Sequence, residues 1–175
     1  MIFWMTLAFV LSQIFAGIAI IWDIFSFQFK KREAIITCFL ISATCIAIHY
    51  ALLDRYSAAM IIGIGIIRFF ISIFSTNKYW IPFFITLYIF ATYILFKDWY
   101  DLLILTSLSL STIASFQKND KILRYFMFWG TLITIIYNFL IFSPVWVLLE
   151  SIFLVSNIVW YYRHYIRKDI KNITT

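Results

Sequence analysis

Two groups of small and polar residues recur at the same spacing in an otherwise apolar chain. Each group has members at positions i, i+3 and i+7, so in a helix its side chains share one face. The groups, separated by 89 residues, are Ser42, Cys45 and His49, and then Thr131, Thr134 and Asn138. Such side chains can hydrogen-bond a neighbouring helix or a bound solute. His49 and Asn138 therefore either cap a solute path or bind a loop carbonyl.

The same offset of 89 relates a second motif. Ser26-Phe27-Gln28 stands before one basic loop, and Ser115-Phe116-Gln117 stands before another. We therefore predict that the chain contains a repeated three-helix unit. In membrane transporters built from repeats the solute site lies between the halves, so the repeat bears on function as well as on fold.

Residues suited to enzyme or metal chemistry are sparse. The two histidines, His49 and His164, belong to no cluster of His, Cys and carboxylate residues with metal-ligand spacing. Cys38 and Cys45 would lie about 10 Å apart along one helix, which is too far for a disulfide. No glycine-rich phosphate loop is present. We therefore expect no enzymatic activity, no metal and no cofactor.

The composition indicates that a membrane surrounds the elements that carry these residues. Of the 175 residues, 64% are hydrophobic and 13% charged, whereas an average soluble domain has about 25% charged residues. Seven apolar runs approach the ~20 residues that cross the hydrocarbon core of a bilayer. They are Met1–Phe27, Ala34–Leu53, Tyr56–Phe74, Tyr79–Phe96, Trp99–Phe116, Ile122–Phe142 and Pro144–Tyr162.

The fold class predicted from these runs is all-α, a polytopic membrane protein with seven transmembrane helices. One helix lies between the two repeats, so the second unit enters the membrane in the same direction as the first, and the repeats are parallel. The predicted units are a first three-helix unit (1–75), a linker transmembrane helix (76–98), a second three-helix unit (99–164) and a cytoplasmic basic tail (165–175).

Basic residues predict the orientation in the membrane. Eleven of the fourteen Lys and Arg residues fall in alternate loops and in the tail. The positive-inside rule then places the N-terminus outside and the C-terminus in the cytoplasm, which requires an odd number of spans. These charges act as topology determinants and also meet anionic lipid headgroups, so the net charge of +6 requires no nucleic-acid partner.

Arg68 lies about twelve residues into the third predicted helix. An arginine near the bilayer centre costs roughly 2.5 to 3.5 kcal/mol. Asp23 is about as close to the cytoplasmic end of its own helix, so we predict a structural charge pair between the two. The alternatives are snorkelling to the interface and a cation that faces the solute path and receives an anionic solute. We expect Arg68 to point into the protein and not toward lipid.

Glu150 and Asn157 share one face of the last predicted helix. A carboxyl that stays protonated at Glu150 could couple proton movement to transport; hydration, or Arg55 as a partner, is the alternative. Asn157 lies near mid-membrane, where it either lines a solute path or makes an interhelical hydrogen bond worth about 0.6 kcal/mol.

Several short motifs are specific enough to suggest a family. They are Ser-Phe-Gln-x-Lys at 26–30, the His49-Tyr50 pair on a helix with small residues, and Asn157 near the end. Through them the chain resembles the YgjV-like family of bacterial inner-membrane proteins over nearly its whole length. The resemblance implies a location in the bacterial inner (cytoplasmic) membrane and does not imply an activity.

The arrangement of three, one and three helices also resembles SWEET and PQ-loop carriers. That resemblance implies a central solute path lined by both units, with Asn157 at the depth of their solute-binding asparagines. Those carriers have a Pro-Gln hinge where this chain has Phe27-Gln28 and Phe116-Gln117. Pro82 and Pro144 lie at helix starts, so proline-hinged motion is not expected.

Two functions fit these patterns. We expect a small-solute transporter or facilitator, with an anionic solute as one option; the alternative is a non-transporting scaffold or a subunit of a larger complex. The expected partners are the lipid bilayer, an unidentified small solute and, in a homo-oligomer, a second copy of the chain. Transport would be favoured if the candidate path residues converged on one cavity: Arg68, Asn157, His49, Asn138 and Glu150.

Overall fold

The computed structural model describes residues 2–96, 98–140, 142 and 144–166, and over these residues it is all-helical. The helices are α1 (Ile2–Phe25), η1 (Ser26–Gln28), α2 (Arg32–Leu52), α3 (Tyr56–Phe74), α4 (Trp80–Leu95), α5 (Asp101–Ser115), α6 (Asp120–Leu140), α7 (Pro144–Tyr161) and η2 (Tyr162–Ile166). The seven α-helices of the described part match the seven predicted runs, which confirms the all-α prediction. The predicted tail lies outside the described residues from position 167 onward.

The helices differ in how well their length suits a bilayer. Three spans are long and apolar enough to cross a membrane: Leu7–Gln28, Arg32–Leu52 and Asp120–Leu140. Shorter apolar helices cover Ala58–Phe74, Trp80–Leu95 and Asp101–Ser115. The 15 residues of α5 reach about 22 Å, less than the ~30 Å of a typical hydrocarbon core. A bilayer that thins locally around α5 would accommodate the difference in length.

The connection between α1 and α2 shows how the chain ends one helix and begins the next. The hydroxyl of Ser26 donates to the carbonyl oxygen of Asp23 at 2.6 Å, and the last turn tightens into the 3-10 turn η1. Phe29 then adopts an extended conformation, φ −102° and ψ 145°, which ends the helical run. The first backbone hydrogen bond of α2 runs from the N–H of Ile35 to the carbonyl of Lys31.

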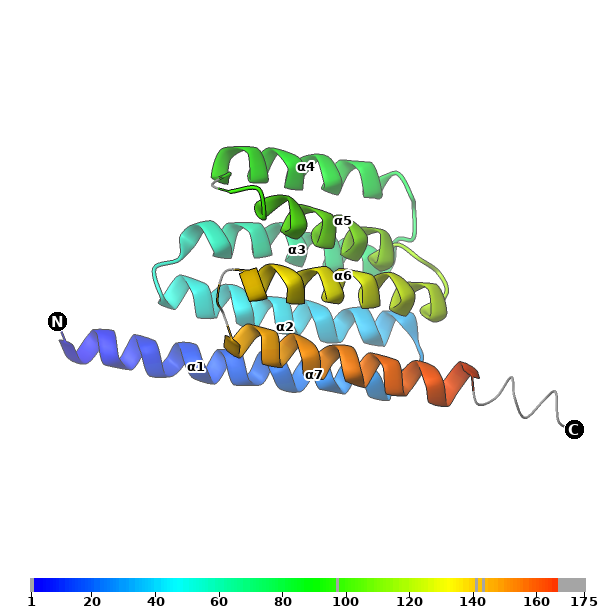
Figure 1. The fold of residues 1–175 in the computed structure, drawn as a ribbon, viewed down its shortest axis with the longest axis horizontal. Coiled ribbons are helices and arrows are strands. Elements are labelled where there is room, and N and C mark those ends of the chain that lie inside the picture. Colours follow the sequence, from blue (N-terminus) through cyan, green and yellow to red (C-terminus); the bar gives the residue numbers. More distant parts are fainter. Residues whose placement is uncertain (1, 97, 141, 143, 167–175) are drawn as a thin grey trace, which may run out of the picture.

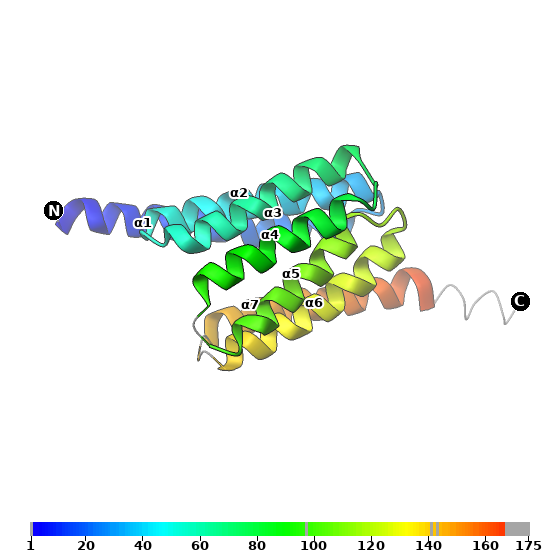
Figure 2. The ribbon, with the colours of Figure 1, turned by 90° about the horizontal axis from the view of Figure 1, so that it is seen from above.

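Helices that follow one another in the chain pack side by side in two groups (Figure 1). In the first group α1 packs on α2 and α2 on α3; in the second, α5 packs on α6 and α6 on α7. α4 contacts α5 and α3 and lies at the edge farthest from α1. The groups meet where α1 contacts α7 and α3 contacts α5 (Figure 2). A shared apolar core there includes Ile36, Phe69, Ala114 and Leu123.

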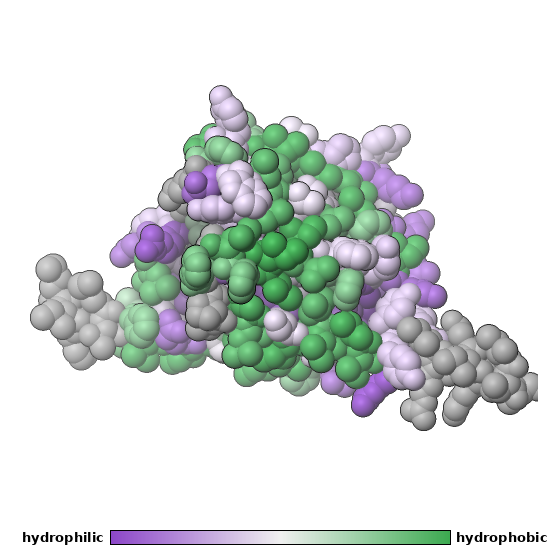
Figure 3. Space-filling view, viewed as in Figure 1, coloured by the Kyte–Doolittle hydropathy of each residue, from purple (hydrophilic) through white to green (hydrophobic). Residues whose placement is uncertain are grey.

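The outer surface is suited to lipid. Figure 3 shows a broad apolar band over the middle of the molecule, with hydrophilic side chains gathered toward the two ends of the helices. Large apolar side chains are exposed on the helices, for example Phe90 on α4 and Phe139 on α6. Hydrocarbon tails solvate such side chains, whereas exposed apolar patches of this size are rare on soluble monomers.

Arg32, the first residue of α2, joins the ends of three helices. Its guanidinium donates to the carbonyl oxygen of Gln117 at 2.5 Å and to that of Ser115 at 2.6 Å, both at the end of α5. It also donates to the carbonyl of Ser72, in the last turn of α3, at 2.5 Å. The last carbonyls of a helix lack intrahelical donors and carry partial negative charge, so a guanidinium stabilises them.

Arg124, in the first turns of α6, makes the reciprocal connection. Its guanidinium donates to the carbonyl oxygens of Ser26 and Phe29, just past the end of α1, at 3.0 and 3.2 Å. It also lies 3.8 Å from the ring centroid of Trp160. An arginine of the first group therefore binds the end of α5, and an arginine of the second group binds the end of α1. Both ends carry the repeated Ser-Phe-Gln motif.

The two arginines correct part of the sequence interpretation. Both were counted among loop charges that determine topology, yet Arg32 is 6% exposed and Arg124 is 2% exposed. The neighbouring Lys30 and Lys31 are exposed. Burial distinguishes the arginines that bind helix ends from the exposed lysines beside them, whereas a count of loop charges treats them alike.

We predict that Arg32→Met and Arg124→Met each lower the free energy of unfolding by about 2–4 kcal/mol, because backbone carbonyls lose charged donors. Thermal unfolding of the purified protein in detergent would measure the loss. Lys31→Met, at an exposed neighbouring position, should leave the midpoint within error. Arg32→Lys should not restore stability, because one ammonium group cannot span carbonyls on two helices. Wild-type midpoints for both methionine variants would contradict the prediction.

Candidate functional site

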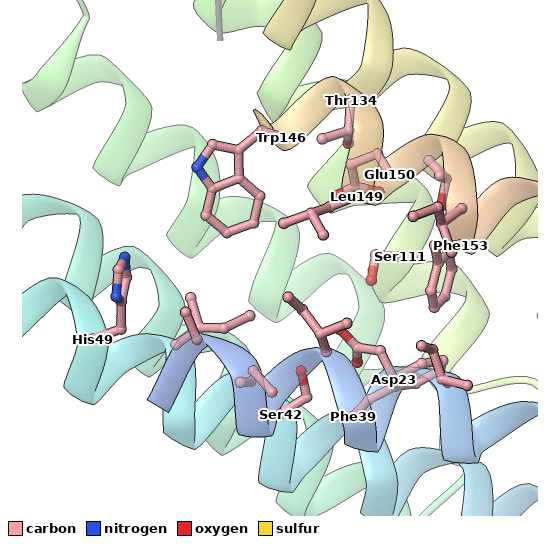
Figure 4. Close-up of a pocket in the computed structure, with 18 of the residues that line it drawn as sticks. Asp23, Phe39, Ser42, His49, Ser111, Thr134, Trp146, Leu149, Glu150 and Phe153 are labelled. Atoms are coloured by element: carbon pink, nitrogen blue, oxygen red, sulfur yellow. The ribbon is translucent and has the colours of Figure 1, made fainter. Parts of the chain in front are cut away.

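A cavity of about 700 Å³ lies between the two helix groups. Its wall is formed by α1, α2 and α3 of the first group and by α5, α6 and α7 of the second. Figure 4 shows the cavity with side chains entering from both groups. Most of the wall is apolar, and a smaller set of polar side chains interrupts it: Gln13, Asp23, Ser42, His49, Ser107, Ser111, Thr131, Thr134 and Glu150.

Two carboxyl groups face this cavity. Asp23 on α1 and Glu150 on α7 point into it from opposite sides (Figure 4). The hydroxyl of Ser42 on α2 lies within hydrogen-bonding reach of the Asp23 carboxyl. Among the described residues of the wall there is no lysine and no arginine. The formal charge of the cavity wall is therefore negative when the carboxyls are ionised.

One end of the cavity is bordered by His49 and aromatic rings. The Nδ1–H of His49 donates to the carbonyl oxygen of Ser12 at 2.8 Å, which fixes the imidazole between α2 and α1. Trp146 of α7 lies across the cavity from His49 (Figure 4). Its ring stacks on Tyr50 of α2, with ring centroids 6.3 Å apart and planes inclined by 10°. This stack connects the two groups at the end away from the arginine bonds.

The opposite end of the cavity is lined by a cluster of phenylalanine rings. Phe39, Phe69 and Phe153 line it; the ring centroids of Phe39 and Phe69 are 5.9 Å apart, and those of Phe39 and Phe153 6.0 Å apart. Phe27 packs against Phe153 at 5.0 Å. Phe27 lies between Ser26 and Phe29, whose carbonyls Arg124 binds, so the phenylalanine cluster and the arginine bonds lie at the same end of the bundle.

The wall on the side of α5 and α6 is held by hydroxyl groups. Ser107 donates to the carbonyl oxygen of Gly130 at 2.9 Å, and its hydroxyl lies 2.7 Å from that of Thr134. A β-carbon added at Gly130 would lie 3.5 Å from the Ser107 carbonyl oxygen. The glycine therefore allows α5 and α6 to approach closely, as small residues do between membrane helices.

The structure brings together only part of the predicted path. His49 and Glu150 line the cavity, whereas Arg68, Asn138 and Asn157 lie outside the set of residues that form its wall. The amide nitrogen of Asn157 donates to the carbonyl of Arg124 at 3.2 Å. That of Asn138 donates to the carbonyl of Thr134, one turn earlier, at 3.0 Å. Both asparagines are buried and bind the backbone.

Arg68 points into the protein but does not meet its predicted partner. Its guanidinium donates to the hydroxyls of Thr112 at 2.9 Å and Ser111 at 3.0 Å, both on α5. It lies 4.3 Å from the ring centroid of Phe69. Arg68 and Asp23 are both described, and no ion pair joins them. Hydroxyl oxygens and an aromatic face take the place of the predicted carboxylate.

Sequence reasoning missed the role of Asp23 as part of the wall, because it assigned the carboxyl to Arg68. It also missed Trp146, which was not singled out from the other aromatic residues. The sequence did contain a sign of the first of these. Asp23 and Glu150 are acidic residues inside predicted spans, where an ionised carboxyl is costly and often belongs to a functional site. The position of Trp146 depends on the approach of α7 to α2.

We predict that Arg68 and Asp23 act independently on stability. The effects of Asp23→Asn and Arg68→Met on the free energy of unfolding should add to within about 0.5 kcal/mol in the double variant. Arg68→Met combined with Thr112→Val should instead show a coupling of about 1 kcal/mol, because those side chains share a hydrogen bond. The free energies of unfolding of the single and double variants, measured in detergent, give the coupling energy of each pair. A coupling above 1 kcal/mol for Arg68 and Asp23 would show that they form an ion pair in the membrane.

No curated protein and no solved structure matches the chain. The model of one protein family, Imp-YgjV, described as bacterial inner membrane protein, matches residues 10–168. The matched range contains every residue of the cavity wall, from Gln13 to Phe153. As its short motifs indicated, the chain belongs to the Imp-YgjV family of bacterial inner membrane proteins.

Proposed function

We propose that this multi-pass inner membrane protein is a transporter or facilitator of a small solute, and that the cavity between the two helix groups is its solute site. The observation that carries the proposal is the cavity, whose volume of about 700 Å³ lies within the roughly 300–1,000 Å³ of ligand pockets. Protein interiors are normally close-packed. A protein that only held partners together would have no use for this space.

The proposal includes two parallel three-helix repeats, α1–α3 and α5–α7, with α4 as the linker. The repeated polar faces of α2 and α6 both line the cavity, which supports this arrangement. Ser42 and its counterpart Thr131 both belong to the wall. His49 and Thr134 also belong to it, whereas their counterparts Asn138 and Cys45 do not. Helices of one copy of the chain supply the whole described wall, so the proposal needs no second copy.

The proposal also includes the orientation predicted from the basic loops, with the N-terminus outside and the C-terminus in the cytoplasm. The phenylalanine cluster lies at the end of the bundle where the basic loops emerge. In this orientation we place the cytoplasmic gate at this cluster. Transport then requires a second conformation in which Phe39 and Phe153 separate, as alternating access demands.

An anionic solute is no longer part of the proposal. That option depended on Arg68 facing the path, and Arg68 instead binds hydroxyl groups of α5. No lysine or arginine belongs to the described wall.

We predict that a cysteine at position 17 becomes labelled from both faces of the membrane. Gly17 lines the cavity, and a β-carbon there meets no atom within 4 Å. The test uses Gly17→Cys in a background with Cys38→Ala and Cys45→Ala. A membrane-impermeant thiol reagent is added to right-side-out or to inverted vesicles. Transport by alternating access predicts reaction in both preparations.

Gly63→Cys is the matched control. A β-carbon at Gly63 also meets no atom within 4 Å, but Gly63 does not line the cavity, so it should stay unlabelled from either face. Labelling of position 17 from one face only would favour a non-transporting scaffold or subunit.

We predict further that Lys31→Cys, in the same cysteine-free background, reacts only in inverted vesicles. Lys31 is exposed beside the buried Arg32 and belongs to a loop placed in the cytoplasm by the positive-inside rule. Reaction in intact cells with an impermeant reagent would refute the proposed orientation.

A further inference from the structure

We infer that the solute is a small organic cation, an ammonium group on an apolar body, whose charge binds between Asp23 and Glu150. This inference rests on the proposed function, because it assigns a solute class to the same cavity. It follows from where the chain places its buried charges and from what covers the rest of the wall.

The two carboxyls have no cation of their own. Asp23 and Glu150 enter the cavity from α1 and α7 (Figure 4), and within the described residues neither forms an ion pair. The carboxyls of Glu150 and Asp23 interact electrostatically with each other. A carboxylate at membrane depth is expensive unless a cation or a proton compensates it, and two neighbouring carboxylates increase that cost. An entering cation can satisfy both.

The buried cationic side chains that the structure describes lie outside the cavity wall. In the described part of the chain three guanidinium groups are buried, those of Arg32, Arg68 and Arg124. Arg32 and Arg124 bind backbone carbonyls, and Arg68 binds chiefly the hydroxyls of α5. A chain that only needed to neutralise Asp23 and Glu150 could have paired them with these arginines. The separation leaves both carboxyls without a cationic partner among the described residues, so a cation from outside can take that place.

The remaining wall suits an apolar body and not a bare metal ion. Ile20, Ile46, Leu108, Leu149 and Ile152 contribute much of it. A metal ion would need several oxygen ligands gathered within about 2.0–2.6 Å. Within the described residues no group of three His, Cys, Asp or Glu side chains could hold one.

An aromatic face at the opening strengthens the case for an ammonium group. The indole of Trp146 belongs to the cavity wall and is held by its stack on Tyr50. Ammonium groups are attracted to the faces of tryptophan rings, and quaternary ammonium ligands are commonly bound in this way. Trp146 therefore offers an entering cation a first contact on its route to Glu150, one turn further along α7.

The test measures protection of the cysteine at position 17 in the cysteine-free background. The label is N-ethylmaleimide, which is uncharged, so its own charge does not bias the rate. The probe is phenyltrimethylammonium, at millimolar concentration. Benzenesulfonate carries the same ring with the opposite charge, benzyl alcohol carries it with none, and sodium chloride supplies an inorganic cation.

Phenyltrimethylammonium should slow labelling at least fivefold, while benzenesulfonate, benzyl alcohol and sodium chloride leave the rate within twofold. Asp23→Asn and Glu150→Gln should each remove most of the protection. The matched controls Asp54→Asn and Glu33→Gln change exposed carboxyls outside the wall and should keep it. Each variant is first checked for a monodisperse profile in detergent, and either carboxyl variant alone decides the matter if the other fails to fold.

Equal protection by benzenesulfonate, benzyl alcohol or sodium would overturn the inference, as would full protection in the carboxamide variants. In those cases labelling from both faces would still stand, and the proposed function with it. Labelling from one face with charge-selective protection would instead leave a cation-binding site and remove transport. No labelling from either face would overturn both.

Discussion

A buried guanidinium group can be stabilised by the carbonyl oxygens that a helix leaves without donors at its end, and the two helix groups are joined in this way. Arg32 reaches from α2 to the ends of α5 and α3, and Arg124 reaches from α6 to the end of α1. Each arginine belongs to one group and binds the other. Hydrogen bonds to charged groups contribute about 1.5–3 kcal/mol each, which is large compared with the dispersion contacts that otherwise hold membrane helices together.

This arrangement gives the bundle two different ends. At one end, charged hydrogen bonds and the phenylalanine rings hold both groups together. At the other, the groups are linked by the stack of Trp146 on Tyr50. In the proposed transport cycle, opening the first of these ends breaks several charged hydrogen bonds at once, whereas opening the second separates the ring stack. Asp23 and Glu150 line the cavity between the two ends.

The sequence predicted the seven helices because apolar runs of near-bilayer length leave few alternatives. It also predicted the polar faces of α2 and α6, since a spacing of three and seven residues defines one helix face; Ser42, His49 and Thr131 do line the cavity. The partners of the arginines could not be predicted in the same way. Every residue has a backbone carbonyl, so the residue types do not show which carbonyls accept a hydrogen bond from an arginine. Arg124 binds the carbonyls of residues 95 and 98 positions away. The hydroxyl partners of Arg68 on α5 could not be predicted for a related reason, because serine and threonine residues are frequent along that helix.

The reciprocal arginine bonds also bear on how the protein is made. The end of α1 is completed by a side chain 98 residues later in the chain, and the end of α5 by one that precedes it by 83 to 85 residues. As the ribosome delivers the spans to the membrane one after another, α1 to α3 must be inserted with the carbonyls of Ser26 and Phe29 still lacking their donor. These carbonyls accept their hydrogen bonds from Arg124 only after α6 has been inserted. Neither half is a finished unit on its own, so a chain cut at α4 needs both fragments in the same membrane to assemble.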